Sequence, residues 1–356
     1  MAQRISAIDH VLAGQNYTRI YTTGIPMRAK SHVRYLLDKG GRLWRKLRTI
    51  WSNDTNQTLD VHGYVTPAKL ERLMQQAQII YVHSLFFLQS LSEDLFQKYG
   101  HKIFVDLHGC VVEEAEFNDA PPATIARFQK LEAMAFAHVK NFVSVSDKMT
   151  AFYKDKYKTH QPHFITLPIF NDLTPHKMNR TTREKPSIIY SGGVQKWQNI
   201  DKMTAFIQDH HKDYDFTILT PAPDIFKNKL GNLAEQVEIQ SVPSAQVADF
   251  YQHSDCGFIL RDRNIVNEIA CPTKMIEYIQ YGLVPIVLQP EIGDFNQLGY
   301  RYIQYTQLQN GTAPSALETD AMRTHNYSIL QILQDKQKNG QRELLSRIKT
   351  IGTPRA

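Results

Sequence analysis

Residues 264–278 decide the fold, and they read NIVNEIACPTKMIEY. Pro272 stands where a helix accepts proline, in the first turn, because the N–H that proline lacks would find no intrahelical partner there. Apolar runs with strand character precede the segment at 256–260 and follow it at 284–288. The pattern predicts a βαβ unit whose helix begins at the carboxyl edge of a parallel sheet, where open α/β folds bind ligands.

The start of this predicted helix has the chemistry of a phosphate site. The free N–H groups of the first turn and the positive end of the helix dipole attract an anion. Lys274 adds a full positive charge in the same turn. Glu277 lies one turn further on, where its carboxylate can accept two hydroxyls of a ribose. The segment therefore predicts a site that holds phosphate and ribose.

Length and composition predict a soluble protein with two domains. The chain has 356 residues, of which 42% are apolar and 21% charged. The chain has no run of about 18 apolar residues, so no membrane-spanning helix is expected. The N-terminal residues lack the apolar core of a signal peptide. The three cysteines are odd in number and far apart, which fits neither a disulfide framework nor a zinc site. A reducing cytoplasm is therefore the expected location.

Strand-like and helix-like runs alternate along the chain, which is typical of parallel sheets covered by helices. We predict a first domain over residues 1–170, a polar, proline-bearing linker over 171–186 and a second domain over 187–326. A helical, amphipathic tail over 327–351 has an apolar face that can pack back onto the first domain. Two α/β domains joined by one linker predict a cleft between them.

A group of candidate ligand contacts follows two predicted strands of the second domain. Gly192 and Gly193 follow the first of these strands, and glycines there let the backbone approach a ligand closely. Lys196 supplies charge next to them, and Arg261 follows another strand at the same predicted edge. A tight turn and a surface salt bridge explain the same residues without a ligand. Their value lies in their combination within one domain.

Candidate residues of the first domain also follow predicted strands. His108 leaves a strand end beside a glycine, where it can bind or polarise a hydroxyl. Glu113 and Glu114 come next and are interpreted either as acid and base or as partners in caps and salt bridges. Ser146 is expected to cap a helix, and His83 ends a third strand and is a candidate for the acceptor side.

Several classes of site are not expected. No histidine or cysteine cluster has metal-ligand spacing, and no Asp-x-Asp stands at a strand end, so no metal is predicted. The chain has no Gly-x-Gly-x-x-Gly and no Walker loop, which argues against dinucleotide oxidoreductases and P-loop NTPases. No recognised nucleic-acid module is present, so nucleic acid is not an expected partner.

Taken together, these residues resemble the retaining glycosyltransferases of the GT-B fold, in particular the family 4 group with its bacterial enzymes of capsule, exopolysaccharide and teichoic-acid assembly. The likeness spans residues 79–295. Its motifs are Arg261-Asp262-Arg263-Asn264, Pro272-Thr273-Lys274, Glu277-Tyr278, Gly282-Leu283-Val284-Pro285, Tyr190-Ser191-Gly192-Gly193 and Asp106-Leu107-His108-Gly109 with Glu113-Glu114. The resemblance implies two Rossmann-like doubly wound domains that face each other across a cleft.

The resemblance also implies roles for individual residues. Glu277 would hold the ribose of a nucleotide-sugar, Lys274, Lys196 and Arg261 would neutralise its diphosphate, and His108 would contact the donor sugar. The implied catalytic residues are His108, Lys196, Lys274 and Glu277. The implied donor site adds Gly192, Gly193, Arg261, Pro272 and Thr273. The acceptor-side candidates are His83, His108, Glu113, Glu114 and Ser146.

The activity that the resemblance implies is transfer of a hexose, with retention of configuration, from a nucleotide-diphosphate sugar such as a UDP-sugar. The acceptor would be a polysaccharide, a lipid-linked glycan or a cell-wall glycan, and the reaction would need no cofactor and no metal. The first domain would bind the acceptor and the second the nucleotide-sugar. A homo- or hetero-oligomer is compatible with this assignment.

Two departures from the family pattern keep a second interpretation open. The family often has two glutamates with seven residues between them, and the partner of Glu277 falls at Ile269, one residue from Glu268. It also often has an arginine where this chain has Gly193. The alternative is a non-catalytic GT-B subunit that binds the acceptor and pairs with an active enzyme. A phosphorylase or epimerase of the same architecture is a third interpretation, but the lysine context of a phosphorylase is missing.

A basic, amphipathic stretch lies between Arg28 and Trp51. It carries eight lysines and arginines, with Asp38 the single acidic residue among them, and apolar residues interleave with the charges. Such a stretch is interpreted either as a helix pair on an anionic membrane, at the inner face of the plasma membrane, or as the solvated face of an ordinary helix.

If the Arg28–Trp51 stretch binds membranes, the protein should sediment with anionic liposomes at low salt and be released as salt rises, because the attraction is screened. Neutral liposomes are the control. Absence of binding to anionic liposomes at low salt would exclude the membrane interpretation.

Overall fold

The computed structural model describes residues 2–12, 19–20, 61–62, 67–168, 170, 173–176 and 184–352. These residues fall into two compact units. Unit 1 takes residues up to 145, 153–169 and those from 339 onward, and unit 2 takes 146–152 and 170–338. The basic stretch Arg28–Trp51 and most of the predicted linker lie outside the described residues.

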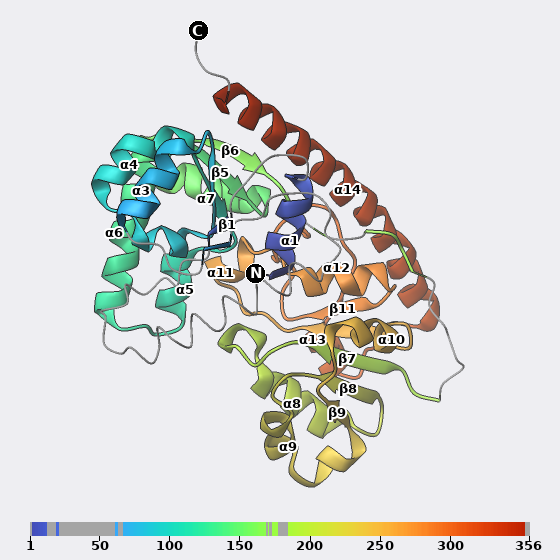
Figure 1. Cartoon of the computed structure of the whole chain (residues 1–356). Helices are drawn as coiled ribbons and strands as arrows, with labels where there is room; N and C mark the ends of the chain where they lie inside the picture. Colours follow the sequence, from blue (N-terminus) through green and yellow to red (C-terminus); the bar gives the residue numbers. More distant parts are fainter. Residues whose placement is uncertain are drawn as a thin grey trace. The chain divides into compact units, whose positions relative to one another are not determined.

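Unit 2 is built on a six-stranded parallel sheet with the order β12-β11-β10-β7-β8-β9 (Figure 1). Its strands are β7 Ser187–Ser191, β8 Asp215–Leu219, β9 Glu238–Gln240, β10 Cys256–Ile259, β11 Val284–Val287 and β12 Ile303–Gln304. The chain therefore builds outward from β7 to one edge, returns to the other side of β7 with β10, and builds to the opposite edge. This is the doubly wound order of the Rossmann fold, and the strands predicted at 256–260 and 284–288 are confirmed as β10 and β11.

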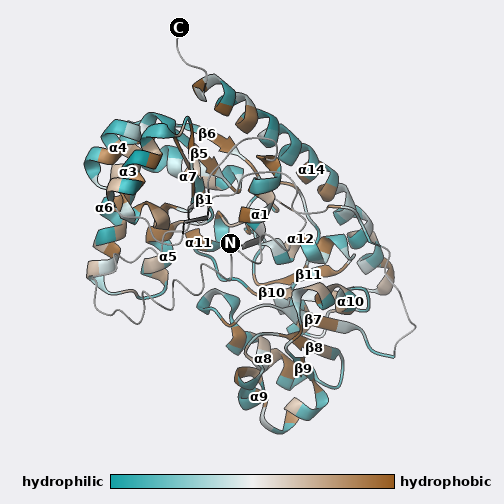
Figure 2. Ribbon diagram, in the orientation of Figure 1, coloured by the Kyte–Doolittle hydropathy of each residue, from teal (hydrophilic) through white to brown (hydrophobic). Residues whose placement is uncertain are grey.

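Helices cover both faces of this sheet, as a parallel sheet requires. They are α8 Ile200–His210, α9 Pro223–Leu230, α10 Val247–Tyr251, α11 Ile265–Glu268, α12 Thr273–Gln280, α13 Tyr305–Gln309 and α14 Ala316–Gly352. Alternate strand residues point to opposite faces, so Ile188 packs with α8 and α9 while Ile189 packs with α12. Figure 1 shows α8 and α9 beside β7, β8 and β9, and Figure 2 shows brown, apolar residues on strands such as β11.

Helix α12 packs directly against the backbone of strand β10. The ring of Tyr278 on α12 rests over Gly257 of β10, where an added Cβ would be 2.3 Å from the ring. The Tyr278 hydroxyl lies 3.4 Å from the carbonyl oxygen of Ile189 and from the amide nitrogen of Ser191. Because any larger residue than glycine would push the ring away, Gly257 determines how closely α12 approaches the sheet.

The start of α12 differs slightly from the prediction. The helix begins at Thr273, and Pro272 is its N-cap, with φ −70° and ψ 117°, one position earlier than expected. The extended ψ of Pro272 explains this, because a helical residue needs a negative ψ. The loop before it contains a short helix, α11, that was not predicted. The Asn264 side chain caps α11 by accepting from the amide of Asn267 at 3.0 Å.

Unit 1 contains a four-stranded parallel sheet with the order β3-β4-β5-β6, and a separate parallel pair of β1 with β2. The strands are β1 Arg19–Ile20, β2 Val61–His62, β3 Ile80–His83, β4 Ile103–Leu107, β5 Asn141–Ser144 and β6 His163–Thr166. The helices are α1 Ala2–Val11, α3 Pro67–Gln76, α4 Glu93–Tyr99, α5 Val111–Phe117, α6 Pro122–His138 and the last part of α7 Asp147–Lys156. The helical periodicity of the sequence at 67–76 and 123–137 corresponds to α3 and α6.

Aromatic stacking holds α6 against this sheet. The ring of Phe136 stacks on Phe142 of β5 at a centroid distance of 4.2 Å and on Tyr157 at 4.0 Å. The other face of the sheet packs against α1 and the end of α14, where Ile8 and Leu344 are both fully buried. Residues of α14 from 339 onward thus belong to unit 1, and Gly340 of α14 lies against the backbone of β6 and Leu167.

Among the described residues, no helix is both long enough and apolar enough to cross a membrane.

Replacement of Gly257 by alanine tests the close approach of α12. The added Cβ would overlap the Tyr278 ring, and such overpacking costs about 1–3 kcal/mol of unfolding free energy. Urea denaturation should show a lower midpoint. The matched control is Gly352→Ala, whose Cβ would have no neighbour nearer than 3.9 Å. An unchanged midpoint for Gly257→Ala would show that α12 is not held by this contact.

Candidate functional site

The switch point of the unit 2 sheet lies between β7 and β10, where the direction of winding reverses. The carboxyl end of β7 leads into Gly192 and Gly193, and the carboxyl end of β10 leads to Arg261. Helix α12 begins with Thr273 and Lys274, and Glu277 follows one turn later. The structure thus brings the Lys274 side chain close to Gly192 and to the Arg261 charge within unit 2.

Lys274 is the central side chain of this site. Its ammonium Nζ lies 3.9 Å from the centre of the Tyr190 ring and donates to the Gln198 side-chain oxygen at 3.2 Å. A Cβ on Gly192 would be 2.8 Å from Nζ, so the glycine leaves the space that the lysine fills. Burial and the neighbouring Arg261 charge hold the pKa of Lys274 well below its usual value, although Glu277 acts in the opposite direction.

Arg261 is the second cation of the site. Its guanidinium approaches the Asn267 side-chain oxygen at 3.4 Å. Burial lowers the pKa of Arg261 to about 10. Among the described residues, neither Arg261 nor Lys274 forms an ion pair with a carboxylate. Since partly buried cations without anionic partners are costly, this pair is suited to bind an anion.

Buried polar side chains brace the loop that carries Arg261. Asn267 is fully buried and donates to the Asp262 carbonyl at 2.8 Å. Asn199, which adopts a left-handed backbone conformation with φ 51°, donates to the Leu260 carbonyl at 2.9 Å and to the Asp262 carboxylate at 2.8 Å. These contacts fix the exit from β10 and therefore the position of Arg261.

Glu277 is half-buried on α12 and accepts a hydrogen bond from the Tyr251 hydroxyl at 3.1 Å. This contact engages Oε2. The hydroxyl of the buried Tyr251 therefore orients the Glu277 carboxylate, which can still accept hydrogen bonds from ligand hydroxyls.

The remaining predicted donor residues lie at the rim. Lys196 is exposed and begins a short 3-10 turn, Lys196–Gln198, and Thr273 is exposed at the first residue of α12. The Gln195 side chain folds over Gly193.

The missing second glutamate of the family pattern has a structural counterpart. Ile269 is 3% exposed and forms part of the core, and the Glu268 carboxylate lies 3.3 Å from the Arg263 guanidinium. A second ligand-binding glutamate is therefore not in the expected position.

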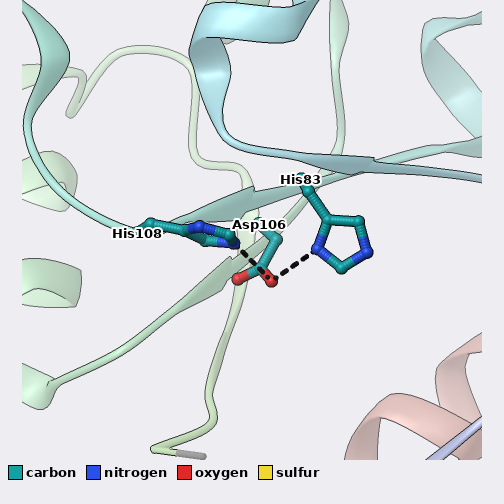
Figure 3. Close-up of side chains that lie close together, drawn as sticks. All are labelled: His83, Asp106 and His108. Atoms are coloured by element: carbon teal, nitrogen blue, oxygen red, sulfur yellow. Dashed lines mark hydrogen bonds and ion pairs between the residues drawn. The ribbon is translucent and has the colours of Figure 1, made fainter. Parts of the chain in front are cut away.

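Unit 1 contains a cluster of buried and half-buried polar side chains, of which Figure 3 shows His83, Asp106 and His108. Asp106 of β4 is fully buried, and its carboxylate receives the Arg4 guanidinium in a forked contact, with Nε at 2.8 and 2.9 Å from the two oxygens. His108 places Nε2 at 3.0 Å from Asp106 Oδ2, and His83 places Nδ1 at 3.5 Å from the same oxygen. The rings of His83 and His108 lie 5.8 Å apart.

The charges of this cluster balance within it. Burial alone would raise the pKa of Asp106, but Arg4 and the hydrogen bond from His108 hold it well below its usual range. Burial lowers the pKa of His108, although Asp106 opposes this. At neutral pH the cluster thus contains an ionised Asp106, a charged Arg4 and a neutral His108.

The ligand atoms of His83, Asp106 and His108 lie within 4.8 Å of one another, which makes them a possible metal site. The Arg4 guanidinium, however, contacts both oxygens of the carboxylate. A divalent cation on the same carboxylate would face a fixed positive charge at short range and would displace that ion pair. The residues therefore fit a carboxylate that orients imidazoles better than they fit a metal.

The other acceptor-side candidates make contacts of their own. The Glu113 carboxylate lies 2.6 Å from Lys156 Nζ, and Lys156 also pairs with the buried Glu132. The Glu114 carboxylate lies against Gly109, and burial raises its pKa.

Ser146 is a helix cap, as predicted: its hydroxyl accepts from Met149 N at 3.1 Å and donates to the Ile269 carbonyl at 2.6 Å. Acceptor contacts from Glu113, Glu114 and Ser146 stay a prediction.

The sequence analysis did not identify Arg4, Asp106, Tyr190 or Tyr251 as individual contributors. Asp106 had a detectable signal, since it is the one charged residue in the apolar strand Ile103–Leu107. Arg4 had none, because its partner lies 102 residues away.

No protein-family model matches the chain, and no curated protein sequence matches it. Solved structures are similar in fold. One is an E. coli trehalose-6-phosphate protein bound with UDP-2-fluoro glucose, with a TM-score of 0.58, 14% identity and coverage of 81% of this chain and 76% of that one. Another is WaaG, a glycosyltransferase involved in lipopolysaccharide biosynthesis, with a TM-score of 0.54, 10% identity and coverage of 81% of this chain and 85% of that one.

A third is a glycosyltransferase from Rickettsia africae, with a TM-score of 0.56, 13% identity and coverage of 95% of this chain and 90% of that one. At these identities the likeness establishes the fold and not the activity. The predicted fold class is confirmed: the chain has a mixed α/β fold with parallel sheets that matches GT-B structures over most of its length.

A Lys274→Met variant should be as stable as the wild type or more stable, because it removes a cation that burial disfavours. The pKa of Lys274 is lowered in the folded protein, so above the ordinary value of 10.5 the lysine does not destabilise the fold. As pH falls from that value to the lowered pKa, the destabilisation grows, and at lower pH it stays constant. Urea midpoints at about pH 7 and about pH 10 measure this difference.

The control for this variant is Lys229→Met, which removes an exposed lysine paired with Asp201. It should show no gain in stability at either pH. A clear loss of stability in Lys274→Met near neutral pH would mean that the lysine stabilises the fold and is not an unfavourable cation that an anionic ligand would stabilise.

Proposed function

We propose that the protein is a retaining glycosyltransferase that transfers a hexose from a nucleotide-diphosphate sugar to a glycan acceptor. The observation that carries this proposal is the pair of cations, Lys274 and Arg261, at the switch point of the unit 2 sheet, without carboxylate partners among the described residues. The N-terminus of α12 adds a positive dipole end at the same place. A diphosphate supplies the missing negative charge.

The reaction would develop charge where these groups lie. When the bond between the sugar and the diphosphate breaks, the leaving group gains negative charge and the sugar becomes oxocarbenium-like. Lys274, Arg261 and the amides of the first turn of α12 would stabilise the leaving group, and such preorganised donors are each worth about 10²–10³ in rate. Retention by front-face attack without a protein nucleophile is the family 4 expectation.

Glu277 supports a ribose, and so a nucleotide, in this site. Glu277 comes three residues after Lys274, about 4.5 Å further along the helix axis, and Tyr251 orients its carboxylate, which supports a hydroxyl acceptor beside the proposed diphosphate position. UDP is the nucleotide we propose, since a structure of the same fold was solved with UDP-2-fluoro glucose. Two protein cations can balance the diphosphate charge, so we expect transfer without added metal or other cofactor.

For the acceptor we propose a polysaccharide, lipid-linked or cell-wall glycan, as in capsule, exopolysaccharide or teichoic-acid assembly. The role of WaaG in lipopolysaccharide biosynthesis supports a membrane-proximal glycan. The basic stretch Arg28–Trp51 would then contact the inner face of the plasma membrane from the cytoplasm.

The alternative of a non-catalytic subunit is less well supported. A subunit that binds only the acceptor would not need a phosphate site, whereas Arg261 and Lys274 supply two cations at the switch point of the unit 2 sheet. Glu268 and Gly193 are the residues that favour it, because they leave positions of the family pattern unfilled.

A calorimetric screen against UDP, GDP, CMP and their sugar conjugates, without metal, tests the donor site. We expect saturable binding of one nucleotide and a loss of affinity of roughly 10- to 100-fold in Glu277→Ala, the value of hydrogen bonds to a charged group. Glu238→Ala, at an exposed strand residue remote from the site, is the control. Absence of binding by every nucleotide would favour the non-catalytic alternative.

Lys274→Ala should lower kcat/KM for transfer by about 10²–10³-fold, because the leaving group loses one preorganised cation. The fold should be intact, as judged by thermal unfolding. Lys229→Ala removes a lysine of the same unit that pairs with Asp201 on the surface, and it should transfer at the wild-type rate. Wild-type activity in Lys274→Ala would exclude this lysine from the reaction.

A further inference from the structure

We propose that Arg4 and Asp106 are positioning residues that fix the tautomer of His108: the ring carries its proton on Nε2, and Nδ1 is left to accept a hydrogen bond from a ligand hydroxyl. The tautomer follows from unit 1 alone. That the ligand is a sugar rests on the proposed function.

Arg4 keeps Asp106 ionised and stationary. The Asp106 carboxylate is 0% exposed and receives Arg4 through both oxygens. Arg4 is itself 9% exposed; its Nη2 pairs with Asp106, and its Nη1 donates to the Leu167 carbonyl at 2.9 Å. A guanidinium always carries a charge, and this one is held by its contacts with both Asp106 oxygens and with the Leu167 carbonyl. A lysine could not make these contacts together, because it lacks the planar, forked set of N–H donors.

The ionised carboxylate determines where His108 carries its proton. A carboxylate of this kind only accepts hydrogen bonds, so His108 Nε2, at 3.0 Å from Asp106 Oδ2, must be the donor. The charged or titratable groups that face the ring are Asp106, Arg4 and His83, with Tyr81 behind Asp106. Burial and Arg4 lower the pKa of His108, whereas Asp106 raises it, and the result is a lowered value. A neutral ring with Nε2–H has a lone pair on Nδ1.

The other ring nitrogen of His108 is unused. Nδ1 is buried and has no hydrogen-bond partner among the described residues. A buried acceptor without a partner is unfavourable, and native proteins rarely retain one without a reason. The side chains of His108 and His83 are 14% and 20% exposed, in contrast to the fully buried Asp106, so the two imidazoles are the accessible parts of the cluster.

The charge of the cluster indicates the class of ligand. Asp106 and Arg4 cancel, and His108 is neutral, so the cluster presents no net charge to a ligand. An anion would gain nothing from this pair, whereas a hydroxyl can donate to Nδ1. The inferred ligand group is therefore an uncharged hydroxyl, as on a sugar or another polyol.

Histidine ¹⁵N spectra of the full chain without ligand test the tautomer. In the wild type, His108 should show a protonated Nε2 and an unprotonated Nδ1. In Asp106→Asn, the amide oxygen would face Arg4 and the amide nitrogen would donate to Nε2, so the proton should move to Nδ1. A wild-type ring with its proton on Nδ1, or the same tautomer in both proteins, would overturn the proposal.

A second variant is needed if Asp106→Asn leaves Arg4 unpaired and the protein fails to fold. The double variant Arg4→Gln with Asp106→Asn removes both charges together, and the amide introduced at position 4 can donate to the amide oxygen introduced at position 106. The same move of the proton to Nδ1 is expected. Stoichiometric zinc binding that shifts the signals of both His83 and His108 in the wild type would overturn the assignment, because it would identify a metal site.

Transfer kinetics supply the functional readout. Asp106→Asn should lower kcat by about 10- to 100-fold, the cost of leaving a buried hydrogen-bonding group without its partner, and leave the donor KM nearly unchanged. Asp255→Asn is the matched control, since Asp255 pairs with Arg323 and precedes β10, at the opposite end of that strand from Arg261. Equal losses in both variants would overturn a specific role for Asp106. If the wild type transfers no sugar, the proposed function fails, and the spectra still decide the tautomer.

Discussion

The contact of the Tyr278 ring with Gly257 determines where Lys274 and Glu277, the residues of the proposed donor site on α12, lie. Because β10 has no side chain at that position, helix α12 approaches the sheet closely, and its first turn comes level with the loops after β7 and β10. Lys274 and Glu277 belong to the same helix as Tyr278, so their positions follow from that contact. The phosphate and ribose ends of the proposed site are thus parts of one rigid element packed on a buried sheet.

The two units treat buried charge in different ways. In unit 1 the carboxylate of Asp106 and the guanidinium of Arg4 meet in a forked contact, and the His108 ring beside them is neutral. In unit 2 Lys274 is held by an aromatic ring and an amide oxygen, and no carboxylate among the described residues pairs with it. The first arrangement balances its charges without a ligand, and we propose that it orients His108. The second leaves two cations without a carboxylate partner among the described residues, and we propose that it attracts an anion.

The GT-B fold places these groups but does not fix the reaction, since one fold supports many functions. Glycosyl transfer is therefore inferred from the site: two cations, a helix N-terminus and an oriented carboxylate in the order that a nucleotide diphosphate requires. The departures at Gly193, Glu268 and Ile269 leave this chain with fewer charged contacts than the family pattern, and Arg261 supplies the second charge.

The sequence by itself determined the alternation of strands and helices, the parallel character of the sheets and the helix start near Pro272, because apolar periodicity and proline chemistry are local properties. It also marked His108, Lys274, Glu277 and Arg261, which follow strands or begin a helix. Only the tertiary structure decided that Arg4 pairs with Asp106, that Tyr190 lies under Lys274 and that Tyr251 orients Glu277. These partners come from different elements, and no local pattern encodes a contact that forms only when a sheet assembles and buries them together.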